Sequence, residues 1–364
     1  MVDVQQEDQG PSRTSKPHRQ LSQPDNAAIL VHGVSLVRFQ SFSEKPGMDL
    51  KQIRYFVAIV DYGSLTKAAN HLRIAQPALS LQVSNLEAEC GAQLLIRTAK
   101  GVIPTEIGKI LYRHGRIMLR QLEQAREEMK SGVTTISGLV ALGLPTTVTV
   151  PLAMPLVRAV REQYPGIRLQ LFESLSGYLS ELLANNRLDF AVLFRDMETR
   201  SVSVSPLVRE TLHLIGDCGL SDTVKARDTC SLSELHGVPI VLPSSAHDLR
   251  LTVERAFAQA GVEANIVADI DSPRTMISIA SDNLACTILP LSVLPLSQEA
   301  VKGLRTRRIV APEITRTMSL CRLENTPRSP AAVAVEKVVV SLVPQLVTNG
   351  KWPGVTLLGR DRSP

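Results

Sequence analysis

LTKAANHLRIAQPALSLQVSNLEAECG, residues 65–91, decides the fold of the N-terminal part of the chain. Two apolar stripes recur in it at helical spacing, namely Leu65, Ala68, Ala69 and Leu72, followed by Leu79, Val83 and Leu86. Each stripe predicts an amphipathic helix, and residues 73–75 between them form a short turn. Ser64 can cap the first helix, and Pro77 suits the first turn of the second. Because the small Ala69 lets the two helices cross closely, the stretch predicts a helix-turn-helix.

The second of these helices has a face that can enter the major groove of DNA. At 100° per residue, its buried stripe lies opposite Pro77, Ser80, Leu81 and Ser84. Small polar and apolar groups there can meet base edges and thymine methyl groups, while Gln76 can pair with adenine. Leu81 is either an unremarkable exposed leucine or a reader of thymine methyl groups.

The next segment, LLIRTAKGVIPTEIG (residues 94–108), predicts two strands joined by a turn at Lys100 and Gly101. We expect this wing to place Arg97, Thr98 and Lys100 along a phosphate backbone. Helix pairs with short turns also occur in many unrelated proteins, so the pattern alone carries limited functional weight.

Residues 48–112 resemble the N-terminal domain of LysR-type transcriptional regulators, and within that family they are most similar to the nitrogen assimilation control branch. The resemblance is carried by Phe56, Ser64, Ala68, Ala69, 75–80, Gln82, Leu86, Glu87, Arg97, Pro104, Thr105 and Gly108. Ile96 departs from the phenylalanine that most of the family has before the arginine, although LLIRT itself resembles the nitrogen branch. Leu81 stands where a polar residue is common in the family, which bears on sequence preference and not on the DNA-binding role. The expected DNA-contacting residues are Ser64, Lys67, Gln76, Pro77, Ser80, Leu81, Ser84, Arg97, Thr98 and Lys100.

Length and charge agree with a DNA-binding protein of more than one domain. A chain of 364 residues predicts a small domain and a larger, divided one. The net charge of +5 mildly favours a polyanionic partner. Residues 48–130 carry 12 Lys or Arg against 8 Asp or Glu, whereas residues 1–47 carry five of each. Most of the positive excess therefore belongs to the DNA-binding part.

Other classes of protein are disfavoured. Metal-ligand spacing is absent among Cys90, Cys218, Cys230, Cys286 and Cys321, so we expect reduced thiols, no metal and no cofactor. A redox-sensing pair remains an alternative, because members of the family sense oxidants. Phosphate-loop, HExxH and GxSxG motifs are absent, so we expect no catalysis. No apolar run reaches the roughly 18 residues of a membrane span, and we expect a cytoplasmic protein.

Residues 1–47 form a separate N-terminal segment. The stretch up to Asn26 is rich in Gln, Ser, Pro and charged residues without periodicity, which predicts disorder. The more apolar stretch 27–42 predicts a weak strand or a sticky arm. Because the family resemblance begins at Met48, we hypothesise that translation starts there, which N-terminal sequencing of the native protein would test.

Residues 105–130 predict one long helix with an apolar stripe of Leu111, Met118, Leu122, Ala125 and Met129. This stripe packs either on the chain's own domain or on the linker helix of a second subunit, which the family resemblance favours. A homodimer or homotetramer would present recognition helices to half-sites about one helical turn apart, within an interrupted inverted repeat. We expect the hinge to follow, within residues 107–137.

The remainder alternates predicted strands and helices. Strand 139–142, helix 145–166, strand 167–174, helix and strand 176–194, strand 212–217, and helix–strand pairs 254–270 and 274–290 predict mostly parallel sheets. This α/β pattern resembles the bilobed, periplasmic-binding-protein-like effector domain of LysR-type regulators. We expect a winged helix-turn-helix domain at 48–106, lobe I at 138–209 with 313–347, lobe II at 210–312 and a flexible tail at 348–364.

Ligands of parallel sheets lie at the carboxyl ends of strands, where helix N-termini attract anions. The expected effector-binding residues are Thr146, Thr147, Ser174, Ser176, Phe194, Arg195, Ser244, Asp271 and Ser272. Any one of these hydroxyls, taken alone, is better explained as a helix cap. As a set, they predict a site for a small anionic effector.

These observations predict a LysR-type regulator that binds double-stranded promoter DNA and positions RNA polymerase, with nitrogen metabolism as the expected target. Its alternatives are an effector-independent DNA-binding regulator and a bilobed solute-binding protein. A solute-binding protein would need a secretory signal and no winged helix. The implied mechanism is a change in lobe closure that alters DNA bending.

Overall fold

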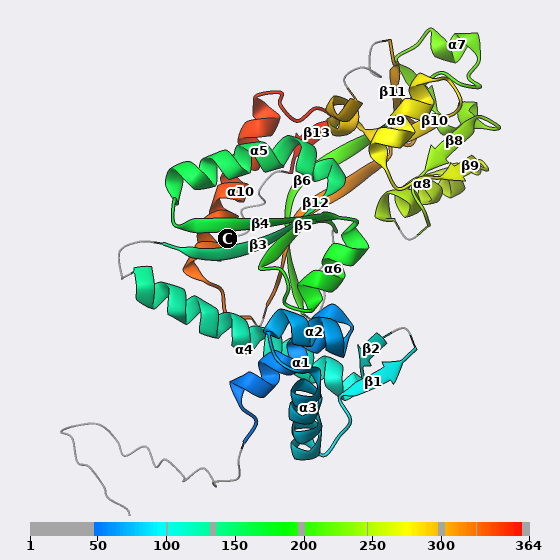
Figure 1. Ribbon diagram of the computed structural model, residues 1–364. Coiled ribbons are helices and arrows are strands. Elements are labelled where there is room, and N and C mark those ends of the chain that lie inside the picture. The colour runs from blue at the N-terminus through cyan, green and yellow to red at the C-terminus, as the bar shows by residue number, and fades with distance from the viewer. Residues whose placement is uncertain are drawn as a thin grey trace, which may run out of the picture. The chain divides into compact units, whose positions relative to one another are not determined.

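The computed structural model describes residues 47–99, 101–131, 136–195, 201–245, 247–297, 303–324 and 326–358 (Figure 1). The predictions made for residues 1–46, for Lys100 and for residues 359–364 lie outside this part of the chain. So do residues 132–135 of the predicted hinge.

A small helical domain opens the described chain. Its elements are α1 (Leu50–Tyr62), α2 (Leu65–Leu72), α3 (Gln76–Cys90), β1 (Leu95–Thr98) and β2 (Gly101–Pro104). Asp49 begins α1 because its Oδ1 accepts a 2.6 Å hydrogen bond from the Gln52 amide, while the Gln52 side chain accepts from the Asp49 amide. The predicted helix-turn-helix is confirmed, with α2 and α3 separated by residues 73–75.

The core of this domain contains both predicted apolar stripes. Its buried members from α2 and α3 are Leu65, Ala68, Ala69, Leu79, Val83 and Leu86. Leu72 is only half-buried at the edge of the same cluster. Phe56 of α1 is fully buried beside them, so α1 closes the side of the helix pair that faces away from the exposed surface of α3.

The wing is held against the turn between α1 and α2. β1 pairs antiparallel with β2, and the Val102 amide donates a 2.8 Å hydrogen bond to the Gly63 carbonyl. Gly101 has a φ of 131°, and a Cβ at this position would overlap the Gly63 carbonyl oxygen. Only glycine therefore fits at the start of β2 without displacing the wing.

The long helix α4 (Glu106–Ser131) begins against α1. Tyr112 donates a 2.5 Å hydrogen bond to Asp61, and Arg116 forms a 3.1 Å ion pair with the same carboxylate. Farther along, Met118 and Met129 are exposed, Met129 to 77%. The predicted helix is thus confirmed, and part of its apolar stripe has no cover in the described chain.

The first lobe of the α/β part is a sheet with helices on both faces. Its elements are β3 (Gly138–Pro145), α5 (Thr146–Gln163), β4 (Ile167–Ser174), α6 (Ser176–Ala184), β5 (Phe190–Phe194) and α10 (Pro330–Thr348). β3 pairs in parallel with both β4 and β5. Val140 and Leu142 of β3 pack with α5 and α10, whereas Ala141 faces α6, as the alternation of a strand requires.

The second lobe has its own core around another parallel set of strands. Its elements are α7 (Asp222–Lys225), β7 (Thr229–Ser231), η1 (Leu232–Leu235), β8 (Pro239–Leu242), α8 (Asp248–Gln259), β9 (Asn265–Asp269), α9 (Pro273–Ser281), β10 (Cys286–Pro290), η2 (Leu291–Ser297) and β11 (Thr306–Val310). β8 lies between β9 and β10 and pairs in parallel with both. Val253 and Phe257 of α8 are buried in this core.

Two long strands connect the lobes, and they correct the prediction of mostly parallel sheets. β6 (Val202–Ile215) pairs antiparallel with β12 (Thr315–Leu323), and the same β6 pairs antiparallel with β10 and β11. β12 also pairs antiparallel with β5. The parallel blocks are therefore joined by antiparallel strands, which local sequence patterns cannot reveal because the partners lie about a hundred residues apart in the chain.

The C-terminal segment is also more ordered than predicted. The prediction of a flexible tail from residue 348 is wrong for residues 348–358, because β13 (Val355–Leu357) pairs with β6 and Trp352 is only 2% exposed. The preceding α10 is long and apolar enough to cross a membrane, but its buried face, which includes Val335 and Val339, packs in the first lobe's core. A core helix accounts for this composition.

Candidate DNA-binding surface and ligand pocket

The exposed face of α3 presents the side chains predicted to contact bases. Gln76, Pro77 and Ser84 are exposed, and Leu81 is 60% exposed. Ser64 stands at the start of α2, where its Oγ accepts a 3.4 Å hydrogen bond from the amide of the exposed Lys67. The chain thus offers a mixed polar and apolar ridge of the kind that reads a major groove.

The wing contributes a cation to the same surface. Arg97 is exposed on β1, and its Nη2 donates a 2.9 Å hydrogen bond to Ser80 Oγ on α3. Thr98 donates from Oγ1 to the Gly101 carbonyl at 3.0 Å, closing the turn of the wing. The structure brings Arg97 and Ser80 together although they are seventeen residues apart in the chain. Sequence reasoning placed them in separate roles.

One exposed cation, Arg73, lies close in the sequence to Gln76 and was not singled out by the sequence analysis. Arg73 occupies the turn between α2 and α3 with a φ of 57°, and its amide closes α2 on the carbonyls of Ala69 and Asn70. Its place next to the start of the predicted recognition helix was the signal available in the sequence.

The predicted effector residues of the first lobe surround the start of α5 and the ends of β4 and β5. Thr147 is buried, and its Oγ1 accepts a 3.1 Å hydrogen bond from Arg316 Nη2. Ser176 is buried at the start of α6, and its hydroxyl has no partner in the described part of the chain. Thr146 and Ser174 are half-buried at the same strand ends. These hydroxyls therefore lie at the carboxyl ends of the strands, and their role in effector binding stays a prediction.

The predicted effector-binding residues of the second lobe form hydrogen bonds that stabilise the local backbone. The Ser244 amide donates a 2.9 Å hydrogen bond to Asp271, and this bond holds the pKa of Asp271 below its ordinary value. Ser272 caps α9, accepting from the Thr275 amide at 3.3 Å. Helix and loop capping accounts for the contacts of these side chains.

A buried ion pair that the sequence analysis missed lies where β6 and β12 pass between the lobes. Arg316 of β12 donates from Nε to Glu210 of β6 at 2.8 Å, and its Nη2 lies 2.6 Å from the same oxygen. Burial raises the pKa of Glu210 and lowers that of Arg316, against their mutual attraction. Ser292 of η2 donates to the Thr147 carbonyl at 3.3 Å and lies 3.5 Å from Glu210. The network thereby links α5 of the first lobe to η2 of the second.

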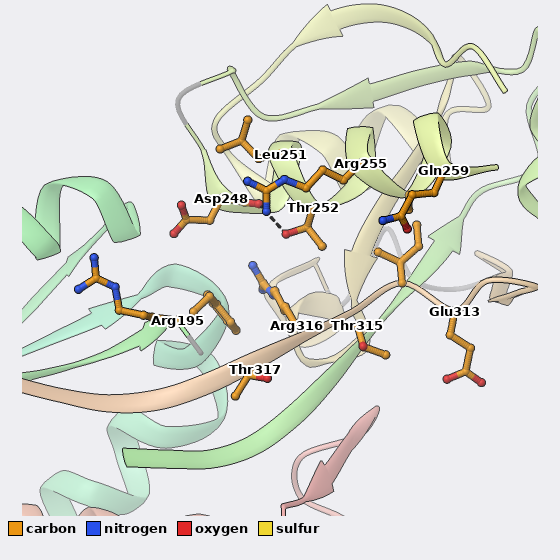
Figure 2. Close-up of a pocket in the computed structure, with 13 residues that line it drawn as sticks. Arg195, Asp248, Leu251, Thr252, Arg255, Gln259, Glu313, Thr315, Arg316 and Thr317 are labelled. Atoms are coloured by element: carbon orange, nitrogen blue, oxygen red, sulfur yellow. Dashed lines mark hydrogen bonds between the residues drawn. The ribbon is translucent and has the colours of Figure 1, made fainter. Parts of the chain in front are cut away.

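A cavity of about 340 Å³ adjoins this ion pair (Figure 2). It is bounded by the end of β5, one face of α8 and the strand β12, and its lining consists of Phe194, Arg195, Asp248, Leu251, Thr252, Arg255, Ala256, Gln259, Glu313, Ile314, Thr315, Arg316 and Thr317. Of the predicted effector residues, only Phe194 and Arg195 line it. Residues of α8 and β12 were missed because nothing in the local sequence marks them as neighbours.

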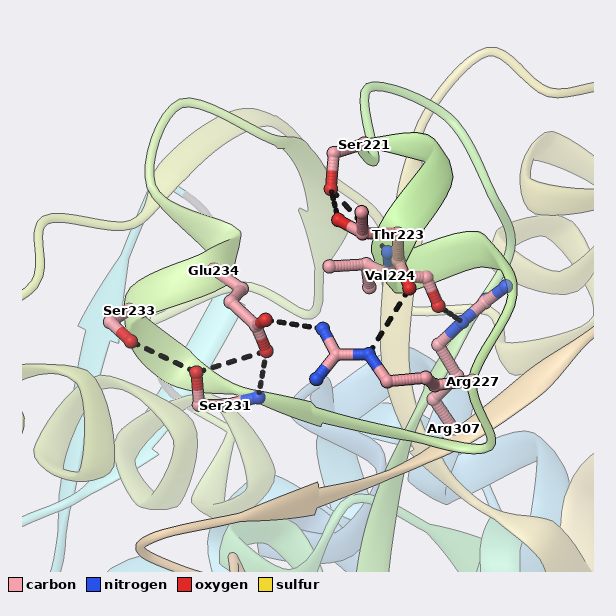
Figure 3. A network of polar contacts seen from close by, with 8 residues as sticks. All are labelled: Ser221, Thr223, Val224, Arg227, Ser231, Ser233, Glu234 and Arg307. Carbon is pink, nitrogen blue, oxygen red and sulfur yellow. Dashed lines mark hydrogen bonds and ion pairs between the residues drawn. The ribbon is translucent and has the colours of Figure 1, made fainter.

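The two most buried arginines of the α/β part differ in how fully they are bonded. Arg307 donates from Nε to the Val224 carbonyl at 3.0 Å (Figure 3). It also donates from Nη1 and Nη2 to two further carbonyls and pairs with Asp217 at 2.6 Å. By contrast, Arg316 Nη1 has no hydrogen-bond partner in the described part of the chain. Arg307 thus stabilises the second lobe through a full set of hydrogen bonds, whereas Arg316 lines a cavity and has one N–H donor atom, Nη1, without an acceptor in the described residues.

Comparison with known proteins agrees with both parts of the chain. Residues 50–109 match the family model of the bacterial regulatory helix-turn-helix protein, lysR family, and residues 134–341 match that of the LysR substrate binding domain. The nitrogen assimilation regulatory protein nac of Escherichia coli (strain K12) is 38% identical over 300 residues, which cover 81% of this chain and 95% of that protein. The protein of the same name from Klebsiella aerogenes is 38% identical over 299 residues, with the same coverage.

Solved structures share the fold. Full-length OxyR from Pseudomonas aeruginosa aligns with a TM-score of 0.66 at 22% identity, covering 82% of this chain and 96% of that one. Full-length CbnR, in a complex with its target DNA, aligns with a TM-score of 0.56 at 20% identity, covering 81% of this chain and 100% of that one. The arrangement of a winged helix-turn-helix, a long helix and two α/β lobes is thus shared with these proteins.

Proposed function

Because the chain belongs to the LysR family of bacterial transcriptional regulators, we propose that it controls its target promoters by inserting α3 into the major groove of double-stranded DNA. The observation that carries this proposal is the exposed face of α3 beside Arg97 of the wing. Base edges are contacted by Gln76, Pro77, Ser80, Leu81 and Ser84. Ser64, Lys67, Arg97, Thr98 and Lys100 contact the phosphate backbone.

The regulator works as a homodimer or homotetramer whose α4 helices pair. The exposed Met118 and Met129 on α4 support this proposal, since a second copy would cover them. Two recognition helices would then address half-sites about one helical turn apart. Residues 48–106 bind DNA, residues 107–137 link and dimerise, and lobes I (138–209 with 313–347) and II (210–312) form the effector part.

Its targets are nitrogen assimilation genes. The support is the 38% identity to the nitrogen assimilation regulatory proteins of Escherichia coli and Klebsiella aerogenes. The protein acts in the cytoplasm by binding and without catalysis, bending the promoter and positioning RNA polymerase. Its lobes respond to a small anionic effector, which shifts lobe closure through unequal affinity for two states.

A genome-wide map of the sites that the protein occupies tests this function. We expect the sites to share an interrupted inverted repeat upstream of genes for nitrogen uptake and assimilation. Sites without a shared motif would contradict sequence-specific binding, and a shared motif upstream of unrelated genes would contradict only the nitrogen assignment.

A further inference from the structure

The cavity beside β12 is lined by several charged and polar side chains. Asp248, Thr252, Arg255 and Gln259 recur at helical spacing along α8 and line one wall, while Arg316 lies on the opposite side (Figure 2). A volume of about 340 Å³ lies within the range of small-molecule sites.

Arg316 supplies a donor that the protein leaves unused. Its Nε and Nη2 are bound to Glu210 and Thr147, but Nη1 is buried without a partner in the described chain. In Figure 2 its side chain extends from β12 toward α8. The centroid of the Phe194 ring lies 3.3 Å from the guanidinium carbon, in a cation–π contact. A buried charged donor without an acceptor is costly, and a carboxylate would satisfy it.

The other charges of the cavity select among carboxylates. Glu313 is engaged by Arg308, so its charge is already paired. Asp248 and Arg255 form no ion pair within the described residues, and they stand two helical turns apart on the same wall. The cavity therefore has one unpaired anion as well as cationic donors. A ligand with only negative groups would be repelled by Asp248, and a simple amine by Arg195, Arg255 and Arg316.

We propose that this cavity binds a free α-amino acid, with its carboxylate on Arg316 Nη1 and Arg255 and its ammonium group on Asp248. This inference rests on the proposed ligand response of the lobes and names its ligand class. The ligand bridges β12, which runs between the lobes, and α8 of the second lobe. Binding would thereby stabilise one arrangement of the lobes over another.

Thermal unfolding and isothermal titration of the full-length protein test the proposal without DNA. The probes are the standard L-amino acids, each compared with its N-acetyl derivative, which lacks the ammonium group, and with succinate. We expect at least one amino acid to raise the unfolding temperature, and its acetylated form and succinate to have little effect. Asp248→Asn and Arg255→Gln should each weaken the binding of that amino acid by at least about tenfold. Arg274→Gln, on the exposed side of α9, should leave the affinity unchanged.

The proposal would be overturned if none of the amino acids bound, if the acetylated form bound equally well, or if Asp248→Asn kept the wild-type affinity. Stronger binding of succinate would point instead to a dicarboxylate and also overturn it. Operator binding by the same preparation is measured separately. A preparation that binds its operator but no amino acid contradicts the ligand assignment alone, and one that binds an amino acid but no operator contradicts the regulatory function.

Discussion

Arg97 of the wing donates a 2.9 Å hydrogen bond from Nη2 to Ser80 Oγ on α3. The bond joins a residue predicted to contact phosphate with one predicted to contact a base. Arg97 is exposed and Ser80 is half-buried, so the pair lies where DNA would contact both α3 and the wing. The position of the arginine is thus linked to the identity of residue 80.

This linkage predicts that Ser80 and Arg97 do not act independently. Ser80→Ala should lower the binding free energy at the cognate site by about 1–3 kcal/mol. Arg97→Ala should cost less in the Ser80→Ala background than alone, because the hydrogen bond is already absent. A double-mutant cycle measured by fluorescence anisotropy checks this. Ser84→Ala, on the same face of α3, is the matched control, and its effect should be strictly additive with that of Arg97→Ala. Strict additivity between Ser80→Ala and Arg97→Ala would contradict the linkage.

Lys100, which falls between β1 and β2 in the sequence, is predicted to contact a phosphate. Its replacement by alanine should weaken binding to every DNA sequence and reduce the slope of log affinity against log salt by about one unit. Gln76→Ala should instead weaken the cognate site alone. Affinities measured over a salt series distinguish the two, and an unchanged slope in Lys100→Ala would remove the phosphate role.

The buried pair of Glu210 and Arg316 predicts a large effect on stability. Glu210→Gln keeps the shape of the side chain but leaves the Arg316 charge unpaired, which should lower the free energy of unfolding by about 3–5 kcal/mol. Urea unfolding followed by fluorescence of Trp352, near the C-terminus of the chain, measures it. Lys225→Gln, which removes an exposed pair with Asp222, should change little. Equal effects of the two substitutions would refute the importance of the buried pair.

His247 predicts a loss of stability in acid. Burial, and then the charge of Arg316, lower the pKa of His247, although Asp248 and Asp271 act in the opposite direction. The unfolded chain therefore binds a proton at higher pH than the folded one, so this contribution to stability is complete above about pH 6.5 and declines as the pH falls below it. His247→Asn keeps the capping acceptor and should lessen the fall in unfolding temperature on acidification. The exposed His236→Asn should not, and identical pH profiles for all three proteins would contradict the assignment.

The parts of the fold that could be predicted depend on local interactions. The turn at residues 73–75, the start of α3 at Gln76 and the extent of α4 follow from helix periodicity and from Pro77 near the start of the helix. The same holds for α5, whose predicted range of 145–166 contains the observed Thr146–Gln163.

The parts that could not be predicted depend on pairing between distant segments. Glu210 and Arg316 are 106 residues apart in the chain, and each occupies a strand whose alternation gives no sign of its partner. Likewise, β13 is a short strand that forms only because β6 offers it an edge. Asp248 and Arg255 follow ordinary helical spacing, so only the packing of α8 near β12 marks them as lining a cavity.

Competition binding on an operator fragment tests the DNA-binding role most directly. The full-length protein is titrated, at moderate salt, onto a fragment from its genomic map and onto a scrambled fragment of equal length. We expect the operator to bind at least about a thousandfold more tightly than the scrambled fragment, and Gln76→Ala to narrow that ratio. Equal affinity of the wild-type protein for the two fragments would contradict recognition of DNA sequence by α3.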